Sequence, residues 1–569
     1  MIFKKFTGLF IFILELLLLG TIQAQDIEQI TKAKWFTVSG GAGANGSGYT
    51  SHGMSNRRDP FAYSISANLN LNFKGIIDAP FSLYFASENK TFNAPAYNFV
   101  GISPRYKWMT AHIGSRNMNM SQYTYAGTTF VGGGIELMPE NFIVKGKAFY
   151  GRLIKAVPVG DTLSPIIRQP VYERWGGAGM ITIGTQSNNV DIIFFKGKDN
   201  IHSLDVVADS ISVKPEENMV FGLNTKQKVG EHLLLSLEYG FSAYTRDIRQ
   251  PDVVYDKYTY ANNFGGLFRP KASSQYAHAW NIKADYQSEF FTVGIAFQRI
   301  DPNYQTMGAL YMTNNVQNIS ANTAVKLLQN KINVSGSFGY QRNNLDNNAE
   351  ATDEQIISSL NFSYAITDNL NASLNFSNYN TSTEAVQILI KDSIKYAQIN
   401  NNLSVNASYA IPGEVLRHSL EISFVMQNVN TIDNEFTEQE SADNQMSGLN
   451  AGYRLGFVET DWNIGVNASA NQNKMATGND VTSSIGVSLN KGFFKKKLQT
   501  TLGFTAMFSN SGTTSNNVNT TRLTLSYRFL KKHSVNFNTN YLHRITNTER
   551  DGKKIAGEWI GTLTYSFAF

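Results

Sequence analysis

The sequence predicts an all-β protein: a single-chain antiparallel β-barrel that spans a membrane with about 26 strands, or about 24 as the alternative. Three observations predict this fold. Short segments of alternating apolar and small polar residues recur, and their connections alternate between short and long. Charged residues make up only 16% of the chain, although the mean hydropathy is −0.24. A soluble protein carries about a quarter charged residues, whereas a barrel between lipid and water needs apolar and uncharged polar faces.

The alternation is clear in the segment 332–340. Its even-numbered residues are apolar, aromatic or glycine, and residues 333, 335 and 337 are Asn or Ser. Successive side chains of a strand point to opposite faces, so one face is apolar and the other small and polar. The same pattern recurs at 360–366, 370–376, 403–409 and 535–541. Each segment approaches the roughly 9–11 residues of a tilted transmembrane strand.

The connections sort by length, as expected for a barrel with tight periplasmic turns and longer extracellular loops. Short polar turns are expected at 139–141, 187–189, 230–231, 330–331, 367–369, 412–414, 459–461, 495–497 and 531–533. Longer polar stretches are expected as loops at 155–171, 200–216, 247–271, 300–315, 380–393, 429–442, 473–480, 509–516 and 546–554. An even strand number requires one more turn, which we place at Ser103-Pro104-Arg105-Tyr106, dividing 96–116 into two short strands.

The N-terminal residues 1–24 are predicted to be a secretory signal peptide. Lys4 and Lys5 precede an apolar run from Phe6 to Gly20, and cleavage is expected after Ala24. The predicted domains are therefore the signal peptide, a short periplasmic segment at 25–34 and the barrel at 35–569. The segment 25–34 is too short for a plug domain, so we expect no N-terminal plug, and anything that fills the lumen must be an inward-folded loop or another protein.

The last strand, Gly561 to Phe569, alternates apolar with small polar residues and ends on an aromatic residue. Its apolar side is formed by Leu563, Tyr565, Phe567 and Phe569. This pattern resembles the C-terminal signature of bacterial outer-membrane β-barrels, and the Ala24-Gln25 junction resembles exported proteins of the Bacteroidota. The resemblance implies location in the Gram-negative outer membrane, contact with its lipid and lipopolysaccharide, and recognition of the last strand by the barrel-assembly machinery.

Catalytic and cofactor motifs are not found in the sequence. The eight histidines lack metal-site spacing, the glycine runs lack the Lys-Ser/Thr of a phosphate loop, and there is no cysteine. The formal net charge of +5 is small for so long a chain, which argues against a nucleic-acid partner. We therefore predict no enzyme activity, no cofactor and no metal.

Three regions are candidates for function. Arg116 and Arg152, in an aromatic and basic region, are expected to project into the lumen and to set selectivity toward anions or glycans. Arg57 and Arg58 lie in a loop that forms either a constriction or a contact surface. The loop 247–271 carries Tyr255, Tyr258 and Tyr260, whose rings suit carbohydrate or protein contact.

Three functions are compatible with these features. The first is a pore that passes a solute or polymer across the outer membrane. The second is a secretion, assembly or surface-anchoring barrel whose lumen is occupied by a plug or secreted partner protein. The third is a soluble secreted β-rich adhesin.

Overall fold

The computed structural model describes most of the chain beyond residue 33. The described residues are 34–87, 98–158, 170–204, 213–254, 262, 264–309, 312–349, 351–385, 395–433, 443–475, 478–550 and 552–569. The proposed signal peptide and nearly all of the segment 25–34 lie outside them. In this described part, no helix is long and apolar enough to cross a membrane.

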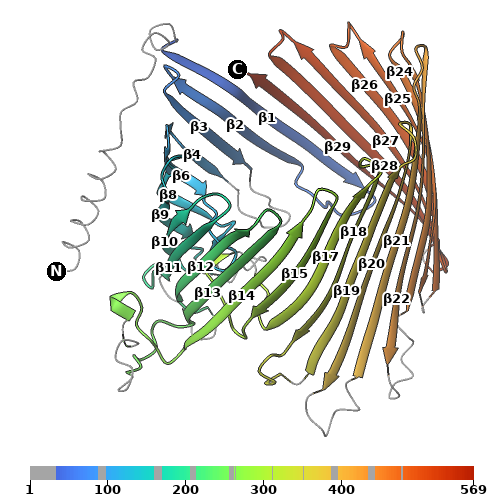
Figure 1. Cartoon of the computed structure of the whole chain (residues 1–569). Helices are drawn as coiled ribbons and strands as arrows, with labels where there is room; N and C mark the ends of the chain where they lie inside the picture. The colour runs from blue at the N-terminus through green and yellow to red at the C-terminus, as the bar shows by residue number, and fades with distance from the viewer. Residues whose placement is uncertain are drawn as a thin grey trace.

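Strands dominate the structure (Figure 1). Those of the first half are β1 (Phe36–His52), β2 (Phe61–Phe73), β3 (Ile77–Ala86), β4 (Phe99–Ile102), β5 (Arg105–Tyr106), β6 (Met109–Asn117), β7 (Tyr125–Ala126), β8 (Thr129–Leu137), β9 (Val144–Ile154), β10 (Arg174–Gly184), β11 (Asn189–Asp199), β12 (Glu217–Val229), β13 (Leu233–Thr245), β14 (Ser274–Gln287) and β15 (Phe291–Ile300). A short 3₁₀ helix, η2 (Phe264–Gly266), precedes β14.

The strands of the second half are on average longer. They are β16 (Gly308–Ala309), β17 (Val316–Leu327), β18 (Ile332–Asn343), β19 (Ala351–Ala365), β20 (Leu370–Ala385), β21 (Lys395–Ile411), β22 (Leu416–Asp433), β23 (Asn444–Phe457), β24 (Trp462–Met475), β25 (Gly478–Phe493), β26 (Leu498–Ser511), β27 (Thr514–Phe529), β28 (His533–Thr548) and β29 (Gly552–Ala568).

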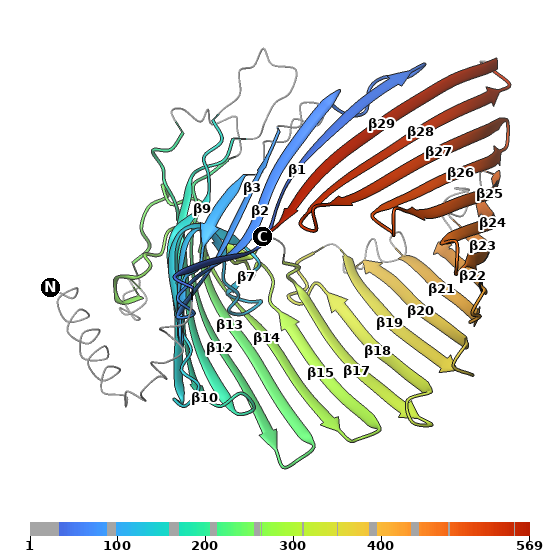
Figure 2. The ribbon, with the colours of Figure 1, turned by 90° about the horizontal axis from the view of Figure 1, so that it is seen from above.

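All but two of these strands form one closed antiparallel sheet, which confirms the predicted barrel. The sheet has 27 strands, and β7 and β16 pair separately. Both β4 and β5 pair with β3 and β6, so they are two pieces of one position and the barrel has 26 positions. Closure comes from β1 and β29, which pair over a long register that includes Gly41↔Ala568 and His52↔Gly557 (Figures 1 and 2). The barrel therefore leaves no free edge.

The extra turn predicted at 103–106 lies directly after these residues. Tyr106 pairs with Met109, so the turn is Lys107-Trp108, and Lys107 has a φ of 52°. Ser103 and Pro104 instead interrupt the strand formed by β4 and β5. The ladder continues across the interruption, since Ser103 N donates to Pro80 O and Pro104 O accepts from Ala111 N, both at 2.9 Å. Proline has no N–H to donate, which explains the break but does not force a reversal.

The loops predicted at 473–480, 509–516 and 546–554 are largely strand. Met475 pairs with Gly478, Ser511 with Thr514 and Thr548 with Gly552, so these connections are only two or three residues long. The strands that they join have 14–17 residues, more than a membrane needs. The ends of such strands extend beyond the lipid and can therefore be polar. The prediction was wrong because it assigned polar residues to loops.

The two faces of the barrel wall differ as the alternation predicts. Apolar side chains such as Ile113, Phe338 and Leu449 are more than half exposed on the outer surface. A surface with this much exposed apolar area is suited to lipid. At the end that carries the short turns, Lys74 lies 4.6 Å above the ring of Trp35, and Lys491 lies 4.8 Å above that of Trp462. Such aromatic and basic residues are typical of a membrane interface.

Candidate functional site in the lumen

Two loops fold into the lumen and join each other there. The first, 118–128, connects β6 to β8, and the second, 301–315, connects β15 to β17. They meet in the parallel pair of β7 and β16, in which Tyr125 is opposite Gly308 and Ala126 is opposite Ala309. Figure 2 shows β7 inside the ring of strands. We call this joined structure the loop pair.

Side-chain hydrogen bonds connect the two loops. The Tyr304 hydroxyl donates to Tyr123 O at 2.7 Å, and Thr306 Oγ1 donates to Thr124 O at 2.7 Å. In the opposite direction, Thr128 Oγ1 donates to Gly308 O at 2.8 Å. The side chains of Tyr304, Thr306 and Thr128 are buried, where an unmade bond would cost more than at the surface. The loop pair is therefore held as one unit.

Further hydrogen bonds attach the loop pair to the barrel wall. Ser121 Oγ donates to Glu238 Oε1 of β13 at 2.7 Å. Asn218 of β12 accepts from Met307 N at 3.1 Å, and Ser242 Oγ of β13 donates to Gln305 O at 2.6 Å. Lys147 Nζ of β9 donates to Asn119 O. These contacts reach both loops from three strands.

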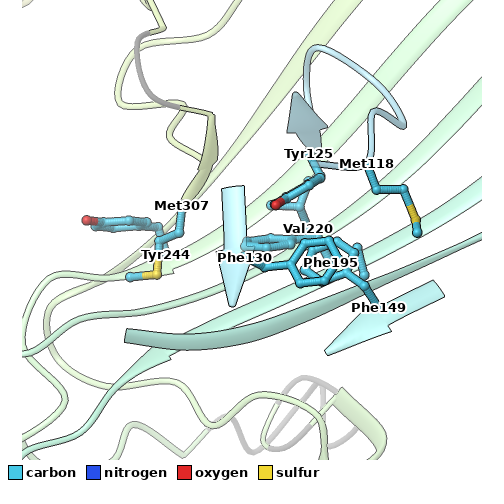
Figure 3. Packing of buried hydrophobic residues seen from close by; sticks show 9 residues of the cluster. Met118, Tyr125, Phe130, Phe149, Phe195, Val220, Tyr244 and Met307 are labelled. Carbon is cyan, nitrogen blue, oxygen red and sulfur yellow. The ribbon is translucent and has the colours of Figure 1, made fainter. Parts of the chain in front are cut away.

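The wall beneath the loop pair is apolar on its inner face, which is unusual for a surface facing a lumen. Phe149 of β9, Phe195 of β11 and Val220 of β12 are buried against Tyr125 and its neighbours (Figure 3). Ring centroids lie 4.4 Å apart for Tyr125 and Phe149, and 4.3 Å apart for Phe130 and Phe149. At these positions the strands are apolar on both faces, because the loop pair covers the inner side and lipid covers the outer side.

A second apolar cluster packs against the other side of the loop pair. Tyr123 and Tyr304 are fully buried and meet edge to face, with centroids 6.2 Å apart. They pack on the inner face of β14, β15 and β17 at Ala277, Ala279, Ile300 and Val316. Burial raises the pKa of the Tyr123 hydroxyl to about 12, so it stays protonated at any physiological pH. It accepts a hydrogen bond from Gln298 Nε2 at 3.0 Å.

Glycines on the inner face make room for the loop pair. A Cβ added to Gly240 would lie 2.4 Å from the Tyr304 hydroxyl oxygen and 2.8 Å from Tyr123 Cβ. One added to Gly222 would lie 2.6 Å from Thr124 Cγ2. The two glycines pair with each other across β12 and β13, so they form one shallow seat. Glycine is required here for close approach.

The opposite part of the lumen wall, from β18 to β24, is lined by neutral polar side chains. A hollow of about 660 Å³ lies against it, and Lys331 and Glu421 are the charged residues among those that line the hollow. Its inner face carries Ser363, Asn371, Ser373, Asn406, Ser408, Ser423, Asn450, Asn467 and Ser469. Neighbouring side chains bond across strands, as Ser469 and Ser484 do at 2.7 Å. This polar arc offers many amide and hydroxyl groups and few charges.

The structure separates the two arginines that we expected in the lumen. Arg116 lies on the inner face of β6, opposite buried Phe130, and donates to Ser82 Oγ at 2.6 Å and Pro80 O at 3.0 Å. Arg152 lies on the outer face, in register with the exposed Val131 and Trp175. Its expected position in the lumen is therefore wrong. Arg152 follows the regular alternation of β9, two residues after the exposed Tyr150, and the register shift at Arg174/Trp175 comes only after it.

Arg174 is the inward arginine of this region, and the sequence analysis missed it. It lies in line with Gly176, on the inner side of β10, and donates to both carboxylate oxygens of Asp199 at 2.7 and 3.0 Å. It also donates to Glu216 at 2.8 Å. The only signal in the sequence was its position at the start of a strand. Its acidic partners are Asp199, which lies opposite it on β11, and Glu216, which directly precedes β12.

The other candidate residues lie near the loop end of the barrel or outside the described residues. Arg57 forms an ion pair with Glu558 of β29 and so bridges the β1–β29 closure. Arg58 is exposed and lines the same hollow as Arg57, Tyr49 and Glu558. Tyr255, Tyr258 and Tyr260 lie outside the described residues.

The C-terminal strand has the orientation that we expected. Leu563, Tyr565 and Phe569 are 53%, 39% and 40% exposed, on the outer surface. The rings of Phe567 and Phe569 meet at 4.6 Å, and Phe569 N donates to Gly40 O at 2.9 Å. The last residue is thus part of the closure.

Comparison with known proteins finds likeness to solved structures. No protein-family model and no curated protein matches the sequence. The translocation pore of the P pilus usher PapC is 10% identical with a TM-score of 0.37, covering 94% of this chain and 99% of its own. OccAB2 of Acinetobacter baumannii is 10% identical with a TM-score of 0.28, covering 67% and 97%. A mutant of the ferric enterobactin receptor PfeA of Pseudomonas aeruginosa is 10% identical with a TM-score of 0.37, covering 92% and 80%. The function of the chain therefore has to be argued from its own lumen.

Proposed function

We propose that this chain is an outer-membrane channel that passes a polar, largely uncharged solute or polymer. The observation that carries the proposal is the division of the lumen wall into two arcs. The loop pair covers the arc from β8 to β17, and the polar arc from β18 to β24 faces the remaining space. A barrel of this size leaves a wide lumen, and the loop pair narrows it from one side.

The chemistry of the polar arc determines the class of solute. Asn amides donate and accept, and Ser hydroxyls do both, so a hydroxyl-rich chain such as a glycan can exchange its water for many weak bonds. Conduction requires contacts that are favourable enough to enter and weak enough to leave. Rows of neutral groups meet this requirement better than a few strong ion pairs.

A second function, secretion or surface anchoring with a partner protein in the lumen, is favoured by the barrel's size. Its 26 positions exceed those of barrels that have an open aqueous channel, and larger barrels commonly carry a plug. The polar arc would then be the surface on which the partner rests.

Conductance of the purified full-length protein in planar bilayers tests the proposal. A channel gives steady openings with little preference between K⁺ and Cl⁻, and liposomes carrying it admit neutral oligosaccharides. A closed protein that co-purifies with a partner in mild detergent supports the second function. A protein that is closed, alone and impermeable to oligosaccharides would contradict both.

A further inference from the structure

The outer wall carries a groove with aromatic and basic residues next to the loop end of β9 to β11. The groove has a volume of about 660 Å³ and is lined on its outer side by Tyr150, Trp175, Phe194, Lys196 and Lys198. The Tyr150 and Trp175 rings stack with centroids 5.9 Å apart. Tyr150, Gly177 and Lys196 are neighbours in one cross-strand row, and the missing side chain of Gly177 forms the floor of the groove.

The loop between β13 and β14 extends this groove with a basic pocket. Its residues 264–268 fold back over the outer wall, with η2 outside the ring of strands (Figures 1 and 2). Phe268 is 1% exposed and packs on the outward-facing Met219 and Ala243. Lys196 Nζ donates to Leu267 O. The adjoining pocket of about 520 Å³ is lined by Lys196, Lys198, Arg249, Arg269 and Lys271.

The pocket is lined mainly by positive charge: five of its lining residues are basic, whereas Asp199 and Glu217 are acidic. Glu217, with 8% of its side chain exposed, accepts from both Lys196 and Lys198 at 3.0 and 3.2 Å. Arg249 pairs with Asp247 and Lys271 with Asp252. Within the described part of the chain, three carboxylates form ion pairs with these basic side chains, and the Lys198 side chain remains 54% exposed. Cations on the lipid side of a barrel are costly at the membrane centre but not near its surface.

We propose that the groove and pocket bind the phosphate of an acylated, phosphorylated glycolipid of the outer leaflet, of the lipid A type. The position of the groove along the membrane normal indicates this ligand. Its aromatic part lies within the membrane-facing wall, where acyl chains pass, and its amines lie within a few residues of the strand ends, where head groups lie. Lys196 and Lys198 contact the phosphate, and Arg269 approaches it from the loop. Tyr150 and Trp175 pack against the first acyl chain.

Native mass spectrometry of the full-length protein in detergent, titrated with bisphosphorylated lipid A, tests this proposal. The double variant Lys196→Gln/Lys198→Gln should bind lipid A roughly tenfold or more weakly, as expected for two surface amines. Lys491→Gln is the matched control, because Lys491 is also an outward lysine against a tryptophan but lies at the turn end. Heat-modifiable gel migration confirms that each variant is folded.

Three further measurements separate a lipid site from a purely structural role. Glu217→Gln should strengthen lipid A binding, because it releases both amines. Lipid A without phosphates should bind to the wild type as weakly as bisphosphorylated lipid A binds to the double variant. Inorganic phosphate at about 10 mM should not displace the lipid, because the acyl chains also contribute to binding. Unchanged binding in the double variant, equal loss in Lys491→Gln, displacement by phosphate or no gain in Glu217→Gln would each overturn the proposal. Channel conductance does not enter this test, so it is independent of the proposed transport function.

Discussion

The Tyr304 hydroxyl donates a 2.7 Å hydrogen bond to the backbone oxygen of Tyr123, although 181 residues separate the two. Both rings are buried inside the barrel, and their contact joins two loops that leave the wall at opposite sides of the covered arc. This hydrogen bond therefore holds the two loops together, and a substitution that removes only the hydroxyl oxygen of Tyr304 can test it.

Tyr304→Phe removes the hydrogen bond between the two loops. The Tyr123 oxygen loses its donor in a buried site, which costs about 1–3 kcal/mol, so the loop pair should fluctuate and single-channel current noise should rise. Because the chain has no cysteine, the pair Ala126→Cys/Ala309→Cys can cross-link β7 to β16 in the same background. Oxidation should restore quiet currents and reduction should return the noise. Equal noise in wild type and Tyr304→Phe would contradict a locking role.

Gly240→Val should displace the loop pair without unfolding the wall. Its Cβ would lie 2.4 Å from the Tyr304 hydroxyl oxygen, and such overpacking costs about 1–3 kcal/mol. Mean conductance should therefore increase as the loops leave their seat. Gly503→Val is the control, since the nearest atom to its Cβ would be 3.9 Å away. A conductance change of the same size in both variants would show that the seat of the loop pair is not the cause.

Much of the barrel could be predicted because its wall obeys a two-residue period. Strand β18 (Ile332–Asn343) matches the alternation at 332–340, and turns such as 412–414 lie where polar residues interrupt it. Closure by the last strand followed from the need to leave no edge in lipid. The polar ends of β24 to β29 follow no such constraint because they extend beyond the lipid, and there the prediction failed.

The loop pair could not be predicted because its contacts are between distant segments. Two local signals were present: Tyr123 and Tyr125 made the region between 98 and 150 conspicuously aromatic, and the residues Ile192 to Phe195 are apolar on both faces of one strand. A strand apolar on both faces needs cover on its lumen side. Neither signal says which loop supplies the cover, and only the register reveals that Arg174 faces inward and Arg152 outward.

Deletion of Phe569 should reduce assembly into the membrane. The deletion removes the Phe569 N–H···O Gly40 bond and the ring contact with Phe567, both at the β1–β29 closure. The heat-modifiable fraction of the protein in isolated outer membranes measures the effect. Phe504→Ala, which removes an exposed outer-wall ring away from the closure, should leave that fraction near the wild-type value. Normal assembly without Phe569 would show that the last residue is dispensable.

Asn450→Asp combined with Asn467→Asp should make the channel prefer cations. Both side chains line the hollow of the polar arc, and Glu421 is the acidic residue among those that line it. Two added carboxylates in a confined aqueous space attract K⁺ and repel Cl⁻. The reversal potential in a KCl gradient should move toward the K⁺ equilibrium value, whereas Asn450→Gln should leave it unchanged. An unmoved reversal potential would mean that ions do not pass along this arc.

Docking of the β13–β14 loop on the outer wall should depend on pH only under acidic conditions. The Arg249 guanidinium holds the pKa of Asp247 below its usual 3.8, and Lys271 does the same for the pKa of Asp252. A carboxyl with a lowered pKa stabilises the docked loop fully above the ordinary value, and this contribution is lost as the pH falls through the lowered one. Hydrogen exchange of the peptide 246–254, corrected for intrinsic rates, should thus show constant protection from about pH 8 to about pH 5, because both carboxyls remain ionised there. Protection should be lost below about pH 4, where the carboxyls become protonated. Asp247→Asn should lower protection at neutral pH and flatten the acid response. Protection that disappears between pH 8 and 5 would instead indicate control by a histidine.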